Sequence, residues 1–201
     1  QGERTLFAFT QGPRGEPQLW RSSFEHNDTR AVALPPLPGA PHWPQLTTLK
    51  NGDLVMGFVV LGQQPYLMTS HDQGRSFGPP HAIGHTRQDV MTLVHLATFG
   101  DGTLAVTTQV ADPQMRVKSF VRFSTDGGAT LSAPTLVTDQ NQNVHDAFPI
   151  TRRDGNVDLY YLREAGAGFE AWRRMVKKDG TLGPEQRLTG PIEPLEAQVT
   201  R

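Results

Sequence analysis

The sequence contains no cysteine, which excludes disulfide bonds and any metal site or nucleophile built on a thiolate. It also lacks an apolar run long enough to cross a bilayer as a helix. Neither charge is in excess, because 19 lysines and arginines stand against 20 aspartates and glutamates. This balance argues against a strongly basic protein that binds nucleic acid. We therefore expect neither a nucleic-acid partner nor a membrane span.

Glycine and proline, by contrast, are abundant, with 20 and 16 residues. Both residues favour tight turns, and many turns are typical of short strands joined by hairpins. A chain of 201 residues can bury one sizeable core or form a small array of repeats. The internal repeats described next favour the array.

One repeat has the pattern Ser-x-Asp-x-Gly-x-Ser/Thr-apolar, at residues 70–77 and 124–131, with a weaker copy at residues 177–184. The aspartate can accept backbone N–H bonds across a turn, and glycine supplies a positive φ without steric cost. The pattern predicts tight hairpin turns. The residues expected to form them are Ser70, Asp72, Gly74, Phe77, Ser124, Asp126, Gly128, Leu131, Asp179 and Gly180.

A second repeat places Asn-Gly or Asp-Gly between apolar runs, with its glycines at Gly52, Gly102 and Gly155. Such dipeptides are the strongest short-range signal of a β-hairpin. Together the two turns divide the chain into units of four strands that recur about every 50 residues, as propeller blades do. We expect three such blades at residues 44–83, 92–138 and 146–189. The fold class is therefore all-β, a β-propeller of four-stranded blades.

The turns and blades resemble the Asp-box family, also called the bacterial neuraminidase repeat family, which includes sialidases. The resemblance covers nearly the whole chain. It implies a sialidase-like propeller whose Asp boxes are structural turns remote from the substrate. Sialidases use an arginine triad, a Tyr–Glu pair and an aspartate, and the Arg-Ile-Pro-like motif is replaced here by His42-Trp43-Pro44 and Ala147-Phe148-Pro149. The catalytic residues are therefore unknown.

The two ends of the chain read as parts of one further blade. Residues 194–201 resemble an inner strand without partners, and residues 4–34 resemble the three remaining strands, with a degenerate box around Ser23–Asp28. Pairing of these segments would close a single domain, residues 1–201, into a ring of four blades and protect open strand edges. The alternative is a fragment of a six-bladed sialidase-like propeller.

Candidate ligand-binding residues gather where inner strands begin and second strands end, since loops at one end of a rigid scaffold commonly carry function. Trp43 could stack on a sugar ring, or it could pack between blades. The candidates are His42, Trp43, Gln63, Asp89, His95, Asp112, His145, Asp146, Arg163, Glu164 and Glu193. Three of them, His42, His145 and Glu193, share a repeat phase and form a weak candidate for an ion in the central channel. We expect no other cofactor and assign no metal site.

These features predict a module that binds a carbohydrate or another small polar ligand. One alternative is a sialidase-like glycoside hydrolase, or a piece of one, and another is a scaffold for protein interactions. We expect an extracellular or periplasmic location, in which Gln1 would follow a cleaved signal peptide. The oligomeric state stays open.

Overall fold

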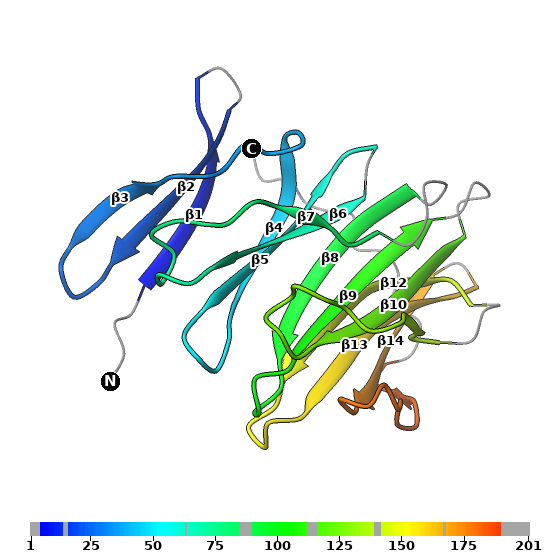
Figure 1. Cartoon of the computed structure of the whole chain (residues 1–201). Helices are drawn as coiled ribbons and strands as arrows, with labels where there is room; N and C mark the ends of the chain where they lie inside the picture. The colour runs from blue at the N-terminus through cyan, green and yellow to red at the C-terminus, as the bar shows by residue number, and fades with distance from the viewer. Residues whose placement is uncertain are drawn as a thin grey trace.

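The computed structural model describes residues 5–13, 16–62, 64–84, 90–111, 116–138, 142–166 and 168–189. The regular elements in these ranges are strands, which form four antiparallel sheets (Figure 1). No helix in the described ranges could span a membrane. The all-β fold with four-stranded blades that the turns predict is confirmed.

Each sheet is built from strands that are consecutive in the sequence. The first contains β1 (Thr5–Gln11), β2 (Pro17–Ser23) and β3 (Asp28–Val32). The second contains β4 (Pro41–Thr48), β5 (Leu54–Val60), β6 (Pro65–Ser70) and β7 (His81–Ala82). The third contains β8 (Val90–Thr98), β9 (Leu104–Ala111), β10 (Val117–Ser124) and β11 (Thr135–Leu136). The fourth contains β12 (Val144–Thr151), β13 (Val157–Ala165), β14 (Gly168–Val176) and β15 (Gln186–Arg187).

Glycines in the left-handed region close the hairpin between the first two strands of each four-stranded sheet. Gly52, Gly102 and Gly155 have φ values of 89°, 98° and 81°, a region in which a Cβ atom is strained. In each turn the preceding Asn or Asp side chain accepts the N–H of the residue two positions later, for example Asp101 from Thr103 at 3.0 Å. These turns therefore form from local chemistry alone.

The Ser-x-Asp turns at residues 70–77 and 124–131 form a denser network between the third and fourth strands. The Asp72 carboxylate accepts the N–H and the hydroxyl of Ser76 at 2.9 and 2.6 Å, and it also accepts the Ser70 hydroxyl at 2.8 Å. Ser70 Oγ in turn accepts the N–H of Gly74 at 2.8 Å. Asp126 makes the equivalent bonds in the second copy.

The weak third copy has a different geometry from the one expected. Asp179 accepts the N–H of Thr181, two residues later, at 2.8 Å, which is the bonding of the simpler Asn-Gly and Asp-Gly turns. Lys177 stands where the other copies have serine, so no hydroxyl is available to bind the aspartate or the turn glycine. Asp179 and Gly180 therefore belong to an ordinary hairpin turn.

Apolar cores fill the spaces between consecutive sheets. Leu19 and Val32 of the first sheet pack with Met56 and Phe58 of the second. Another core joins the second sheet to the third, and another joins the third to the fourth. The turn glycines contribute to this packing, because a Cβ on Gly74 would lie 2.4 Å from the Phe7 ring.

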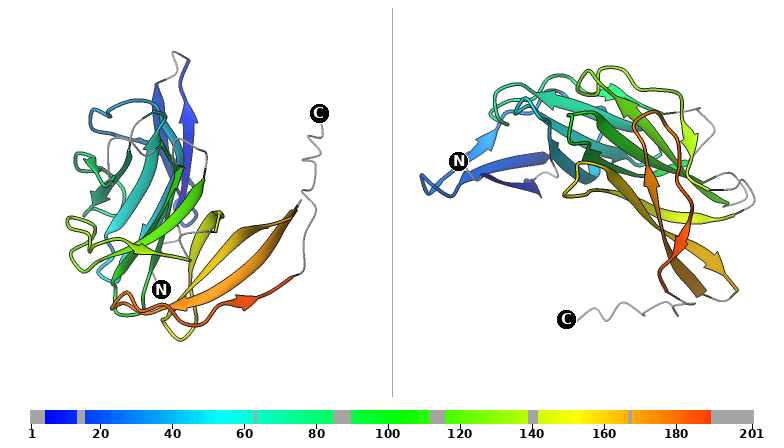
Figure 2. Two further views of the ribbon diagram at one scale, coloured as in Figure 1. Left: turned by 90° about the vertical axis from the view of Figure 1, so that its right-hand side faces the viewer. Right: turned by 90° about the horizontal axis from the view of Figure 1, so that it is seen from below.

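The sheets follow one another along an arc, with the first and the fourth at opposite ends (Figures 1 and 2). The inner strands β4, β8 and β12 are neighbours in contact. No strand pairing joins the first sheet to the fourth among the described strands. Residues 194–201, expected to close the ring, lie outside the described residues, so closure stays a prediction. The first sheet contains the three strands that were expected from residues 4–34.

Candidate functional site

A β-bulge interrupts the start of the inner strand in every four-stranded sheet. The register shifts between His42 and Gln45 in β4, between Met91 and Leu93 in β8, and between His145 and Phe148 in β12. We call this end of the sheets the bulge face and the opposite end, which carries the hairpin and Ser-x-Asp turns, the turn face. Bulges often lie beside functional sites because they redirect a side chain.

Two of these bulges hold a residue other than glycine in the left-handed region. Trp43 has a φ of 48° and Asp146 a φ of 50°. This conformation is unfavourable for a residue with a Cβ, most of all for a large one such as tryptophan. The same strained position therefore recurs on two inner strands that flank a third. Repeated strain at one end of a scaffold points to a functional site.

Trp43 exposes 53% of its surface on the bulge face. Its ring tilts against His42, with 5.6 Å between the ring centroids. So much exposure argues against the packing role that the sequence also allowed. An open indole beside an imidazole is suited to stacking on the apolar face of a ring-shaped ligand.

At the bulge of β12, His145 and Glu164 form a hydrogen-bonded pair. His145 Nε2 lies 2.9 Å from Glu164 Oε1, and the Asn143 amide donates to Glu164 Oε2 at 2.7 Å. These two partners hold the pKa of the Glu164 carboxyl below its ordinary value, with the Asn143 bond as the larger cause. The carboxylate is therefore ionised, and it stays accessible because 45% of the side chain is exposed.

Polar side chains of the third sheet hold the bulge of β12 in place. The buried Gln109 of β9 accepts the N–H of Asp146 through Oε1 at 2.9 Å. The hydroxyls of Thr107 and Ser119 donate to the carbonyl oxygens of Ala147 and Val144. The shape of the site thus depends on two sheets at once.

His95 lies beneath this region on β8. The residue is only 6% exposed, neither ring nitrogen has a hydrogen-bond partner within the described residues, and the ring centroid lies 4.0 Å from that of Phe148. Burial lowers the pKa of His95, and the nearby Asp146 carboxylate opposes this shift. His95 is therefore a neutral, buried ring that packs against the ring of Phe148.

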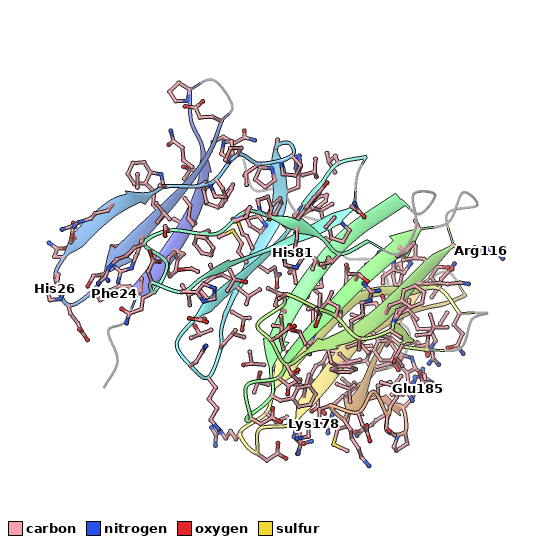
Figure 3. The ribbon with its side chains drawn as sticks, in the orientation of Figure 1. Phe24, His26, His81, Arg116, Lys178 and Glu185 are labelled. Atoms are coloured by element: carbon pink, nitrogen blue, oxygen red, sulfur yellow. The ribbon has the colours of Figure 1, made fainter. Side chains whose placement is uncertain are left out.

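Arg163 does not face the bulge region with Glu164, its neighbour in sequence. Its guanidinium donates to Glu185 and lies 4.0 Å above the Trp172 ring, and the side chain is 13% exposed. Glu185 also accepts the Tyr161 hydroxyl at 2.7 Å. Glu185, labelled in Figure 3, lies in the segment between β14 and β15.

Four of the remaining candidates cannot be placed in the site. Gln63, Asp89, Asp112 and Glu193 lie outside the described residues. Within the described residues, no group of three or more histidine, aspartate or glutamate side chains could hold a metal ion. His145, one of the three proposed ion ligands, is bonded to Glu164 instead.

The turn face has a cavity of about 700 Å³ between the second and third sheets. The acidic residues in its wall already have partners in the protein: Asp53 binds His71, Asp101 binds Lys178, and Asp126 binds the residues of its own turn. We therefore assign these carboxylates to turn structure. The bulge face, with its accessible carboxylate and tryptophan, is the better candidate site.

Comparison with known proteins supports the fold. No family model matches the sequence, and no curated protein matches it. Among solved structures, a protein of unknown function from Dyadobacter fermentans is 15% identical with a TM-score of 0.67, and the match covers 92% of this chain and 60% of that one. A polysaccharide lyase described as an ulvan lyase is 12% identical with a TM-score of 0.66, covering 95% and 57%. A Hadza microbial sialidase is 15% identical with a TM-score of 0.55, covering 82% and 44%.

These similarities show that the chain has a β-propeller fold shared with carbohydrate-active proteins. The chain spans less than two thirds of the length of each of these structures.

Gln109, Asn143 and Phe148 also belong to the site, although they are not among the candidates that the sequence predicts. Asn143 lies two residues before His145, in a polar stretch that could have suggested it. Gln109 reaches the bulge from another sheet, so only the packing of the sheets identifies it.

Proposed function

We propose that the bulge face binds carbohydrate, with Trp43 as the stacking platform and the His145, Asp146 and Glu164 side chains as partners for sugar hydroxyls. The observation that carries this proposal is the strained bulge that holds the exposed Trp43 on the bulge face. Sugar sites commonly combine an aromatic ring, which covers the apolar face of the pyranose, with a few fixed polar groups. An exported location accords with such a role.

The solved structures with similar folds support this proposal. One is an ulvan lyase bound to a glucuronate-rhamnose sulfate disaccharide, with a TM-score of 0.62, and another is an α-L-arabinanase from Penicillium chrysogenum complexed with arabinobiose, with a TM-score of 0.56. Both are propeller neighbours at 15% identity or less, so the sugar specificity of this chain has to come from its own residues.

Glycoside hydrolysis is the second candidate, because Asp146 and Glu164 are carboxylates of one sheet near the same bulge. Hydrolysis needs a protonated acid with a raised pKa beside a second carboxylate. The pKa of Glu164 is lowered, so Glu164 fits the ionised member of such a pair and Asp146 is the remaining carboxyl for the acid.

A glycan array followed by titration calorimetry tests the proposal. We expect Trp43→Ala to weaken binding at least tenfold, because the stacking surface is lost. Phe24→Ala is the matched control, since Phe24 is 64% exposed and lies at the turn-face end of the first sheet (Figure 3). Equal binding by the Trp43 variant and the wild type would contradict the proposed site, and release of a fluorogenic aglycone would favour the hydrolase.

A further inference from the structure

We propose that an apolar hollow on the outer face of the fourth sheet binds the group to which the sugar is attached, so that the ligand is a glycoside with an aromatic or alkyl aglycone. The proposal rests on the proposed function and specifies the substrate class of the same site. The outer face is the side of the fourth sheet that points away from the core shared with the third sheet, at the end of the arc (Figure 2).

The hollow has a volume of about 250 Å³ and extends across the strands of the fourth sheet. Leu162 of β13 pairs with Ala171 of β14, and Leu188, which follows β15, donates its N–H to the Ala171 carbonyl at 2.8 Å. These three residues therefore lie side by side in one row, on the same face of the sheet. Ala171 has the smallest side chain of the row, so it leaves a depression between the two leucines.

Aromatic rings form one wall of the hollow. Phe148 of β12 pairs with Tyr160 of β13, and both residues line the hollow. Phe148 is 42% exposed, and its ring packs against the buried ring of His95 with 4.0 Å between the centroids. The wall is therefore preformed and open to a ligand. Covering it with an aromatic or alkyl group is favourable because apolar surface leaves water.

The hollow offers few hydrogen bonds to a sugar ring. Tyr161 and Trp172 also line it, but the Tyr161 hydroxyl donates to Glu185 at 2.7 Å and Trp172 Nε1 donates to Glu170 at 3.0 Å. Among the residues that line the hollow, Asp146 alone carries a charge. A sugar placed there would leave hydroxyls without partners, which costs free energy. An apolar group has no hydrogen bonds to lose.

The size of the hollow also favours a single apolar ring. Pockets that enclose a whole ligand commonly hold about 300–1,000 Å³, whereas a cavity of about 150 Å³ is large enough for benzene. At about 250 Å³, the hollow accommodates one phenyl ring and is too small for a disaccharide.

The polar side chains proposed to bind the sugar lie directly beside the hollow. His145 pairs with Leu162 across β12 and β13, and Glu164 lies two residues beyond Leu162 on β13. Residues two apart on a strand share a face and are separated by roughly 7 Å, a distance that one sugar ring can span. Asp146, another proposed sugar partner, itself lines the hollow. A sugar bonded to His145 and Glu164 can therefore place its aglycone over Leu162.

Matched methyl and phenyl glycosides of glucose, galactose, mannose, xylose and arabinose test the proposal by titration calorimetry on the whole chain. We expect the dissociation constant of a phenyl glycoside to be at least tenfold lower than that of the methyl glycoside of the same sugar and anomer. Ala171→Trp, which fills the hollow, should remove this gain and leave methyl glycoside binding unchanged. Leu188→Ala, at a position that is 43% exposed, should reduce the gain about threefold.

Two further variants serve as controls. Ala31→Trp makes the same chemical change at an exposed alanine in β3 of the first sheet, and it should change neither dissociation constant. Glu164→Gln should weaken methyl and phenyl glycosides by the same factor of about ten, because both are bound through the sugar.

Four results separate this proposal from the proposed function. Equal affinity for the methyl and phenyl glycosides would overturn the aglycone hollow and leave sugar binding intact. A phenyl gain that persists in Ala171→Trp would place the ring elsewhere and overturn it as well. A dimer in sedimentation velocity that Ala171→Trp dissociates would show that a second copy of the chain fills the hollow instead. Binding of phenol as tight as that of the phenyl glycosides, with no signal on the glycan array, would overturn the proposed function itself.

Discussion

At the scale of single residues, the aspartates of this chain differ in role according to the number of donors around them. Asp72 accepts the Ser76 hydroxyl together with several further donors, and these bonds lower its pKa to about 2. Asp126 has an equivalent shell, in which the Thr130 hydroxyl is the largest cause of a pKa of about 2. Asp179 has one backbone N–H donor at 2.8 Å and no hydroxyl in the serine position. Asp72 and Asp126 therefore hold their turns through several hydrogen bonds, whereas Asp179 makes fewer bonds in the third turn.

Replacing Asp72 by alanine should lower the free energy of unfolding by about 1–2 kcal/mol, because the turn donors lose their acceptor. Urea unfolding followed by circular dichroism measures this loss. Asp179→Ala is the matched control, and its loss should be clearly smaller because the exposed Asp179 carboxylate is bonded within the turn by Thr181 alone. Equal losses at the two positions would show that the network adds nothing to the turn.

Acid should weaken the fold through the same carboxylates. Their pKa values are lower in the folded state than in an unfolded chain, where an aspartate titrates near pH 3.9. The stability they provide is thus complete above about pH 4 and is lost as the pH falls toward 2. We expect the urea midpoint to fall across this window in the wild type and to fall less steeply in an Asp72→Asn, Asp126→Asn double variant. Parallel curves for the two proteins would contradict this origin.

At the scale of secondary-structure elements, the bulges of β4 and β12 hold Trp43 and Asp146 at a positive φ, which is unfavourable for a residue with a Cβ. Trp43→Gly removes a left-handed conformation that costs about 1–3 kcal/mol for a residue with a Cβ. We expect unfolding stability to stay equal or rise by about 1 kcal/mol, while sugar binding is lost. Trp20→Gly, in the regular strand β2, should lower stability, because Trp20 bonds Thr10 and gains no backbone relief. A large loss of stability in Trp43→Gly would make Trp43 a packing residue.

The sequence predicts these elements well where local chemistry decides them. Asn-Gly and Asp-Gly pairs define their own hairpins, so β5 and β9 each begin two residues after the turn glycines Gly52 and Gly102. The bulges could not be predicted, because a register shift depends on the partner strand and on Gln109 from the neighbouring sheet. The pairing of Arg163 with Glu185 was missed for the same reason. Their side chains meet across strands, at a distance in sequence that no short motif covers.

At the scale of the whole molecule, the described parts of the four sheets form a linear array in which apolar cores join consecutive sheets. The recurrence of the unit was visible in the sequence because each copy repeats its turn chemistry. The turns alone do not determine whether these units close into the predicted ring of four blades, because closure depends on the rotation between successive sheets. Pairing of residues 194–201 with the first sheet stays a prediction.

The array also predicts where the molecule opens first. Among the described residues, the second and third sheets each contribute to two apolar cores, whereas the first and fourth each contribute to one. Every residue of β5 and β9 is buried, while β1 and β14 are largely half-buried or exposed. Opening free energies follow the local density of buried contacts, and in repeat arrays stability is a sum of nearest-neighbour terms. Hydrogen–deuterium exchange should therefore be slowest in β5 and β9 and faster in β1 and β14.

A core substitution at one end of the array shows whether coupling is limited to neighbouring sheets. Leu159 is fully buried in the core between the third and fourth sheets, so Leu159→Ala should cost about 2–5 kcal/mol there. If the sheets are coupled only to their neighbours, exchange should accelerate in β13 and β14 and stay unchanged in β5. Acceleration by the same factor in all four sheets would mean that the arc opens as one cooperative unit. The bulge face, which takes residues from the second sheet to the fourth, would then lose its geometry in a single step.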